Sequence, residues 1–157
     1  MPAFKVKRLS DTAKLPEKTH VNDTGYDIFA DRVEDNGKQI KVYTGLAIQP
    51  ATNYYIEVFP RSSIYKKHLQ LANSVAVIDY DYRGEIILIF NKIPVACGSH
   101  AEFGEYLTYS KNSIINEGEK IAQMVVRWRF DVDWQEVDEL NNTARGEGGF
   151  GSTDTGV

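Results

Sequence analysis

Hydrophobic and polar residues alternate along several short stretches of the chain. Residues 4–7, 39–43, 55–59 and 124–130 each have a period of two, which is typical of strands with one buried face. Residues 86–90 are an uninterrupted apolar run, and such a run is typical of a strand covered on both faces. We therefore expect strands at all five places.

Turn signals separate these stretches, and no long segment has the period of about 3.6 residues that marks an amphipathic helix. The turn signals lie at residues 35–37, 81–84, 97–99 and 116–118. One short helix is expected around residues 65–69. Many short strands joined by polar turns predict an all-β sandwich or barrel. No repeat or linker divides the chain, so a single domain over residues 1–157 is expected.

The composition fits this picture. The chain has 157 residues, of which 42% are hydrophobic and 25% charged, enough for one globular domain with a buried core. Its longest apolar run is far shorter than the roughly 20 residues of a membrane-spanning helix. The N-terminus has no apolar region of the kind that a secretory signal uses. We expect a cytoplasmic or nuclear protein without membrane contact, and a viral origin is compatible with the sequence.

Cysteine and histidine are too few for some kinds of site. Cys97 is the single cysteine, so no internal disulfide forms, and His20, His68 and His100 do not suffice for a Cys/His metal cage. A bound metal would have to be a hard ion with oxygen ligands. The formal charge of -4 disfavours direct binding to nucleic acid.

The C-terminal residues 146–157 hold five of the chain's twelve glycines. Taken alone, such a tail is either a floppy terminus or a backbone loop that closes over phosphates, because successive glycines let N–H groups point at an anion.

Five segments, in this order along the chain, resemble the five motifs of the trimeric dUTPase family. They are residues 23–30 (DTGYDIFA), 60–67 (PRSSIYKK), 73–86 (NSVAVIDYDYRGEI), 118–124 (GEKIAQM) and 145–153 (RGEGGFGST). The resemblance spans about residues 22–156. It implies a jelly-roll-like β-barrel, a homotrimer with shared active sites, and Mg2+-dependent hydrolysis of dUTP to dUMP and pyrophosphate by water attack on the α-phosphate. That reaction limits uracil incorporation into DNA and supplies dUMP.

The first two motifs supply groups for the metal and the phosphates. By resemblance, Asp27 holds a water of the Mg2+ shell, whereas an isolated aspartate beside a glycine is usually a turn residue. Arg61, Ser62 and Ser63 are implied to bind phosphate oxygens, and without the resemblance they would be a solvated basic loop. Ser63 stands where the family usually has glycine.

The third motif resembles the family's uridine-binding hairpin. The resemblance implies that Asn73, Ile78 and nearby backbone groups bind uracil, that Tyr82 packs on the sugar and excludes a 2′-hydroxyl, and that Asp79 orients and deprotonates the attacking water. Without the other motifs, these residues would be a charged turn between two strands. Ala76 replaces a common glycine.

The last two motifs complete the phosphate contacts. Gln123 is implied to contact the triphosphate or its metal-bound water. Arg145, Gly151 and Ser152 would bind the β- and γ-phosphates, and Phe150 would cover the uracil as a stacked lid. Residues 144–157 are thus expected to form a mobile, phosphate-binding tail that caps a neighbour's site.

Two alternatives stay open. A dCTP deaminase shares the fold and the nucleotide cradle, although the glycine-rich tail argues against it. A dUTP-gated protein-binding module would use residues 92–117, a segment longer than expected that is either an extended hairpin or loop, or a partner-binding excursion.

Overall fold

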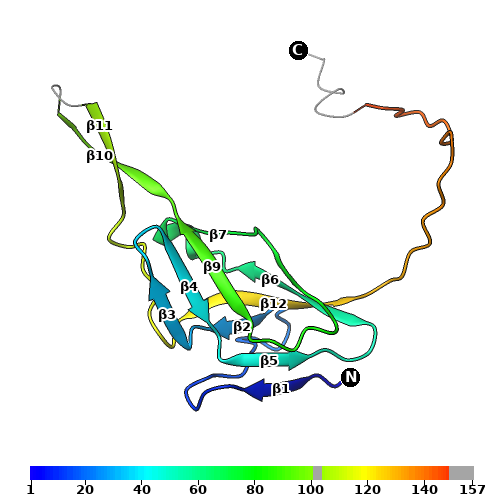
Figure 1. The fold of residues 1–157 in the computed structure, drawn as a ribbon, viewed down its shortest axis with the longest axis horizontal. Helices are drawn as coiled ribbons and strands as arrows, with labels where there is room; N and C mark the ends of the chain where they lie inside the picture. Colours follow the sequence, from blue (N-terminus) through cyan, green and yellow to red (C-terminus); the bar gives the residue numbers. More distant parts are fainter. Residues whose placement is uncertain (101–103, 149–157) are drawn as a thin grey trace.

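Residues 1–100 and 104–148 are described by the computed structural model, in which this part of the chain forms twelve strands and one short 3-10 helix (Figure 1). The elements are β1 (Lys5–Arg8), β2 (Tyr26–Phe29), β3 (Arg32–Asp35), β4 (Gln39–Tyr43), β5 (Leu46–Gln49), β6 (Tyr54–Pro60), the 3-10 helix η1 (Ile64–Lys67), β7 (Leu69–Leu71), β8 (Ala76–Ile78), β9 (Ile87–Lys92), β10 (Pro94–His100), β11 (Gly104–Tyr109) and β12 (Lys120–Trp128).

Two four-stranded antiparallel sheets form the body. One has the strand order β2-β12-β6-β8 and the other β3-β4-β9-β7. Ile40 and Val42 of β4, Phe90 of β9, and Ile56 and Val58 of β6 are completely buried, and they belong to one core cluster to which both sheets contribute. The jelly-roll-like all-β fold expected from the sequence is confirmed.

The period-two pattern produces these strands because alternate side chains of a strand point to opposite faces. In β4, the buried Ile40 and Val42 alternate with more exposed neighbours. The turn before β4 also follows the sequence: Gly37 has a φ of +88°, and the side-chain oxygen of Asn36 accepts hydrogen bonds from the N–H groups of Lys38 and Gln39. The expected turn at residues 35–37 is therefore confirmed.

Strand β9 corrects one expectation. Its residues alternate instead of being buried on both faces: Leu88 and Phe90 are buried, while Ile87 and Ile89 remain 37% and 39% exposed. The prediction was wrong because all five residues of the run are hydrophobic, although only one face of the β3-β4-β9-β7 sheet packs on the core. The short helix, by contrast, is confirmed as η1, which ends where His68 adopts the left-handed conformation with φ 50°.

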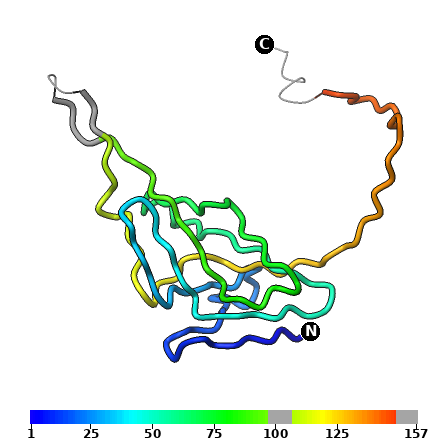
Figure 2. Tube along the Cα trace, in the orientation of Figure 1, coloured from blue at the N-terminus to red at the C-terminus, as the bar shows by residue number. Residues whose placement is uncertain are grey.

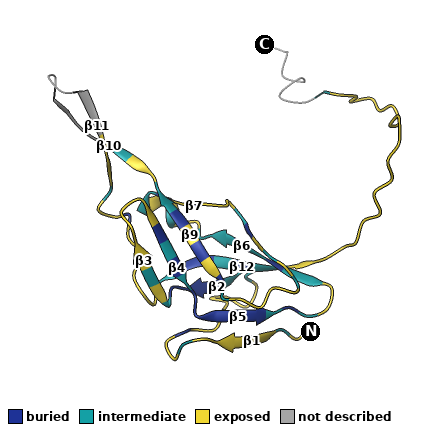
Figure 3. Cartoon of the chain, in the orientation of Figure 1, coloured by how far each residue is buried: buried dark blue, intermediate teal, exposed yellow. Residues whose placement is uncertain are grey.

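Two segments leave the body. Strands β10 and β11 pair antiparallel and project from the end of β9, so the segment at residues 92–117 contains an extended hairpin (Figure 1). After β12, residues 129–148 run away from the sheets as an extended arm (Figure 2). Almost the whole arm is exposed (Figure 3), including Phe130 and Trp134, at 77% and 88%. No helix in the described part of the chain is long and apolar enough to cross a membrane.

Candidate active site

A row of side chains crosses the outer face of the β2-β12-β6-β8 sheet. Asp27 on β2 lies opposite Gln123 on β12, which in turn lies opposite Phe59 on β6. Arg61 follows the end of β6, two residues after Phe59, and so returns to the same face. Asp27, Arg61 and Gln123, which belong to three different sequence motifs, thereby lie on one face of the sheet.

Asp27 is the centre of this group and is only 3% exposed. Its Oδ1 lies 3.2 Å from Nε of Arg61 and 3.5 Å from Nε2 of Gln123. Its Oδ2 accepts from Oγ1 of Thr19 at 3.1 Å and from Nζ of Lys120 at 2.9 Å. Burial alone would raise the pKa of Asp27, but the hydrogen bonds from Lys120 and Thr19 and the charge of Arg61 outweigh it and lower the pKa.

A polar pocket of about 350 Å3 opens beside Asp27. Its lining residues are Thr19, His20, Asp23, Thr24, Gly25, Asp27, Arg61 and Gln123. Gly25 lets its backbone approach Gln123 closely, since a Cβ there would stand 3.1 Å from Cβ of Gln123. The pocket combines a guanidinium with amide and hydroxyl donors, which are the partners that phosphate oxygens require.

Asp79 lies elsewhere on the same sheet. It follows β8 at the start of a turn in which the Tyr82 N–H donates to the Asp79 carbonyl at 3.2 Å. Its exposed side chain lines a second pocket of about 480 Å3, together with Tyr55, Val77 and Arg129. This turn presents a carboxylate and an aromatic ring, the groups expected for water activation and sugar contact.

Within one chain, the side chains around Asp27 and the turn that contains Asp79 do not lie close together. Ile78 pairs with Ile56, so Asp79 is about level with Tyr55, four residues along β6 from Phe59. Three strand spacings also separate β8 from β2. At about 3.3 Å per residue and about 4.8 Å per strand, Asp27 and Asp79 are on the order of 20 Å apart.

The remaining sequence-predicted residues fall at several places. Ser62 and Ser63 are exposed in the loop between Arg61 and η1, where Ser63 is the N-cap without a side-chain hydrogen bond. Asn73 is exposed in the turn before β8, and Ile78 is half-buried in that strand.

The fifth motif lies partly outside the described residues. Arg145 lies in the arm, where its Nε donates to the carbonyl of Gly148 at 2.9 Å. Phe150, Gly151 and Ser152 lie outside the described residues. Their roles stay predictions.

Sequence reasoning missed three residues. Lys120 and Thr19 were not predicted as site residues, yet both contact Asp27. Arg129, which follows β12, was not predicted as a site residue either, and it lines the pocket of Asp79. The one available signal was that Lys120 stands at the basic position of the fourth motif.

The described residues do not fit a metal site held by the protein alone. They contain no group of three or more histidine, cysteine, aspartate or glutamate side chains that could hold a metal ion. A carboxylate has about four lone-pair positions, and the four donors around Asp27 match that number. A water molecule of a Mg2+ shell would have to displace one of them.

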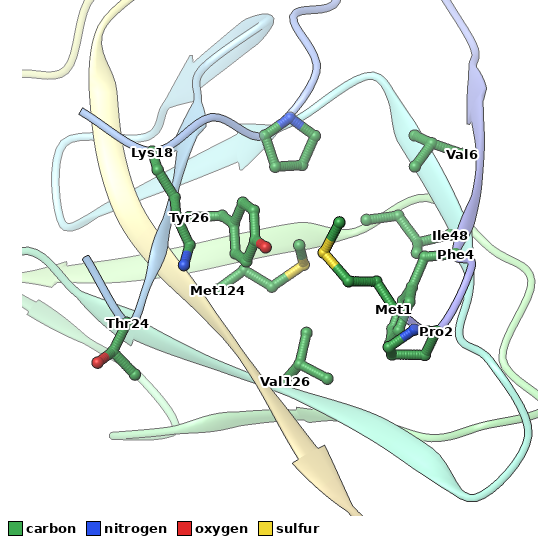
Figure 4. Close-up of a pocket in the computed structure, with 11 residues that line it drawn as sticks. Met1, Pro2, Phe4, Val6, Lys18, Thr24, Tyr26, Ile48, Met124 and Val126 are labelled. Carbon is green, nitrogen blue, oxygen red and sulfur yellow. The ribbon is translucent and has the colours of Figure 1, made fainter. Parts of the chain in front are cut away.

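An apolar groove of about 430 Å3 is distinct from the site (Figure 4). Tyr26 and Met124 line it, and each is next in sequence to a site residue, so both point to the other face of the sheet. Met1 and Phe4 close its other side. The groove offers mainly hydrophobic contact, with Thr24 and Lys18 as polar side chains of its lining.

Comparison with known proteins adds to this geometry. The family model described as dUTPase matches residues 11–95 and 107–154. The chain is 37% identical to the deoxyuridine 5′-triphosphate nucleotidohydrolase of Clostridium tetani, over 96% of this chain and 95% of that protein. It is also 37% identical to the protein of that name from Gloeothece citriformis, with the same coverage.

Solved structures of dUTPases have a fold similar to that of this chain. The Staphylococcus bacteriophage 80alpha dUTPase with dUpNHpp superposes with a TM-score of 0.75 at 29% identity, over 99% of both chains. A variant dUTPase from phage phi11 of S. aureus, described as coordinating a structural Mg(II) ion, has a TM-score of 0.68 at 25% identity, over 89% of this chain and 99% of that one. Of the unmatched residues 96–106 of the family comparison, those that the structure describes, 96–100 and 104–106, belong to β10 and β11.

Proposed function

Since the chain belongs to the dUTPase family, we propose that it hydrolyses dUTP to dUMP and pyrophosphate. The observation that carries the proposal is the pairing of Arg61 with the buried Asp27 beside Gln123, all three of which line a polar pocket. This reaction limits uracil incorporation into DNA and supplies dUMP. We also propose a cytoplasmic or nuclear location, because the reaction acts on a precursor pool of DNA synthesis.

In the proposed reaction, Asp79 orients a water molecule and takes its proton as the oxygen attacks the α-phosphorus in line. The bond from the α-phosphorus to the bridging oxygen breaks, and pyrophosphate leaves with that oxygen. Arg61 and Gln123 stabilise charge on the phosphate chain, together with Arg145, Gly151 and Ser152 of the tail. Positioning and charge stabilisation suffice, because phosphoryl transfer needs little covalent chemistry.

Base and sugar selection are assigned to the hairpin at residues 73–82. Asn73 and the backbone near Ile78 bind the uracil edge, while Tyr82 covers the sugar face and leaves no room for a 2′-hydroxyl. Ser62 and Ser63 add hydroxyl contacts to the phosphates, and Phe150 closes over the base. A mismatched base is rejected because buried donors and acceptors would stay unpaired.

We propose that Mg2+ arrives as the chelate of dUTP. Mg2+ dehydrates reluctantly and commonly takes substrate phosphates as ligands, which suits a chain whose described residues form no metal cage. A related phage dUTPase is described with a structural Mg(II) ion.

The complete site is proposed to form between copies of the chain in a homotrimer. Asp79 is too far from Arg61 for one triphosphate to use both within a single chain, so a second copy has to supply one of them. The arm at residues 129–148 exposes large apolar side chains, a feature that soluble monomers rarely retain without a partner. We assign this arm, with the tail at residues 144–157, to contacts with a neighbouring copy.

The hairpin of β10 and β11 supports a second function. It projects from the body and lies largely outside the family match. The phage 80alpha dUTPase is described as controlling transfer of virulence genes by a proto-oncogenic G protein-like mechanism. A dUTP-gated protein-binding module is therefore the second candidate, and deletion of residues 93–109, with turnover and partner capture measured separately, tests it.

Pyrophosphate release from dUTP, dTTP, dCTP and UTP, measured side by side with Mg2+, tests the first function. We expect release from dUTP alone. Ammonia from dCTP would instead identify a dCTP deaminase, and intact dUTP after prolonged incubation would refute the proposed hydrolysis.

A further inference from the structure

The side-chain ammonium group of Lys120 joins three acceptors. Its Nζ lies 2.9 Å from Oδ2 of Asp27, 3.1 Å from Oε1 of Glu17 and 3.0 Å from Oγ1 of Thr19. A lysine ammonium has three protons, so the three contacts match its donor capacity. The side chain of Lys120 is 27% exposed and that of Asp27 is 4% exposed, so the contact is buried at its acid end and partly open to solvent at the lysine.

The segment held by Lys120 is also tied to β2 through the backbone. The Glu17 N–H donates to the Asp27 carbonyl at 3.2 Å, and the Asp27 N–H donates to the Glu17 carbonyl at 2.7 Å. Residues 17–20 thus add a short edge beside β2. Thr19 and His20 of this segment line the polar pocket, so its position sets one wall of the site.

Asp27 connects this wall to Arg61. Oδ2 accepts from Lys120 and Thr19, while Oδ1 faces Arg61 and Gln123. The carboxylate is fixed from one side by the lysine and orients the guanidinium on the other side. A carboxylate engaged in this way is suited to fixing side chains and less suited to holding metal-bound water.

We infer that Lys120 is a positioning residue: it fastens residues 17–20 to Asp27 and thereby holds Arg61 in the orientation that binds the triphosphate. The inference rests on the proposed function for its effect on turnover. An isolated surface ion pair contributes little, but here one cation joins the segment at residues 17–20 to a buried carboxylate through three contacts, and such networks hold geometry better than single pairs.

Three variants test this role. Lys120→Met removes the ammonium, Lys120→Arg keeps the charge, and Lys67→Met is the matched control. Lys67 pairs with Glu119 at 2.7 Å, donates to the Ile114 carbonyl at 2.9 Å and has a side chain that is 26% exposed, so it is a paired lysine of similar exposure that does not contact Asp27. Steady-state kinetics with dUTP at saturating Mg2+ would be measured for each.

We expect Lys120→Met to raise KM about tenfold while kcat changes less than about twofold, because ground-state and transition-state binding of the phosphates weaken together. Lys120→Arg should restore KM to within about threefold of the wild type, and Lys67→Met should leave KM unchanged. An unchanged KM in Lys120→Met, or an equal rise in Lys67→Met, would overturn the inference.

Affinity for dUpNHpp by calorimetry separates this inference from the proposed hydrolysis, since binding needs no turnover. If the wild type does not hydrolyse dUTP, the hydrolysis proposal fails. The role of Lys120 is then judged by binding alone, and a Kd for dUpNHpp that is roughly tenfold weaker in Lys120→Met supports it. Should that variant not fold by circular dichroism, Thr19→Val removes the Lys120–Thr19 contact and the hydrogen bond from Thr19 to Asp27, and it is expected to weaken binding at least about threefold. Unaltered binding by folded Thr19→Val would then refute the role.

Asp27→Asn distinguishes positioning from metal binding. We expect its KM for dUTP to rise as in Lys120→Met, with no change in the Mg2+ concentration that gives half-maximal rate. A tenfold or greater increase in that Mg2+ concentration, at unchanged KM, would show that Asp27 serves the metal and would overturn the inference.

Discussion

Tyr82 folds back over Gly84 and donates a hydrogen bond from its phenol oxygen to the Glu85 carbonyl at 2.9 Å. A Cβ on Gly84 would overlap the phenol end of this side chain, so glycine at this position is what allows the ring to lie there. The glycine of the third motif therefore sets the position of the Tyr82 ring, to which the proposed function assigns the sugar contact.

We expect Gly84→Ala to displace the Tyr82 ring and weaken discrimination against the ribose 2′-hydroxyl. The ratio of kcat/KM for dUTP to that for UTP should fall roughly tenfold, which corresponds to about 1.4 kcal/mol. The matched control is Gly37→Ala, where a Cβ would meet nothing within 4 Å. Gly37 has a positive φ, so the Gly37→Ala variant should lose some stability, but it should keep its selectivity for dUTP over UTP. Equal selectivity in both variants would exclude the proposed role of Gly84.

Asp79→Asn tests the assigned base. The amide keeps the shape of the carboxylate but takes up no proton, so kcat should fall about a thousandfold, within the range for loss of a general base. Affinity for dUpNHpp should stay within about threefold, because binding relies on other residues. Asp81→Asn, in the same exposed turn, is the control and should retain most activity. A normal kcat in Asp79→Asn would require another base.

The sequence predicted the body of the fold because burial follows a local rule. In β4 and β6, the alternation of side chains alone indicates which face packs on the core, and the strands appear there. The same rule failed for Ile87 and Ile89, since five successive apolar residues contain no information about which face stays exposed.

The site was only partly predictable for a related reason. The motif that contains Asp27 revealed an acid, but not its partners: Thr19 and Lys120 are 101 residues apart in sequence and meet only through the pairing of β2 with β12. The distance between Asp27 and Asp79 likewise depends on strand order, which no single motif contains. Motifs identify chemistry, whereas sheet topology decides which groups a single chain brings together.

Removal of the metal should abolish turnover. With excess EDTA we expect no pyrophosphate release, and added Mg2+ should restore the rate fully, because the chelated triphosphate is the proposed substrate. Thermal melting without nucleotide should be the same with and without EDTA, as the described residues form no metal cage. A fall in Tm on EDTA treatment would instead indicate a structural ion.

The pair of Glu119 and Lys67 predicts how stability changes with pH. Burial would raise the pKa of Glu119, but the hydrogen bonds from Lys67 and from the Asn116 N–H lower it below the ordinary value of 4.5. A carboxyl with a lowered folded pKa stabilises the fold above its unfolded pKa and loses that contribution as pH falls through the folded value.

Glu119→Gln should therefore be less stable than the wild type at pH 7, by about 0.5 kcal/mol for this partly exposed pair. The difference in Tm between the two proteins should shrink as pH falls below about 4.5. The exposed Glu117→Gln is the control and should show no such trend. A constant difference in Tm across this range would rule out the pair as its source.

Complementation between two inactive variants tests whether copies share a site. Asp79→Asn lacks the base, and Arg61→Ala lacks the guanidinium beside Asp27, so each protein alone should be nearly inactive. If each site takes Asp79 from one copy and Arg61 from another, an equal mixture reassembled after dissociation contains intact sites. Random assembly makes the two choices independent, and about a quarter of the wild-type rate should return. Without dissociation the mixture should stay inactive. No recovery after verified exchange of copies would mean that Asp79 and Arg61 act within one chain, against the separation of about 20 Å that the sheet imposes.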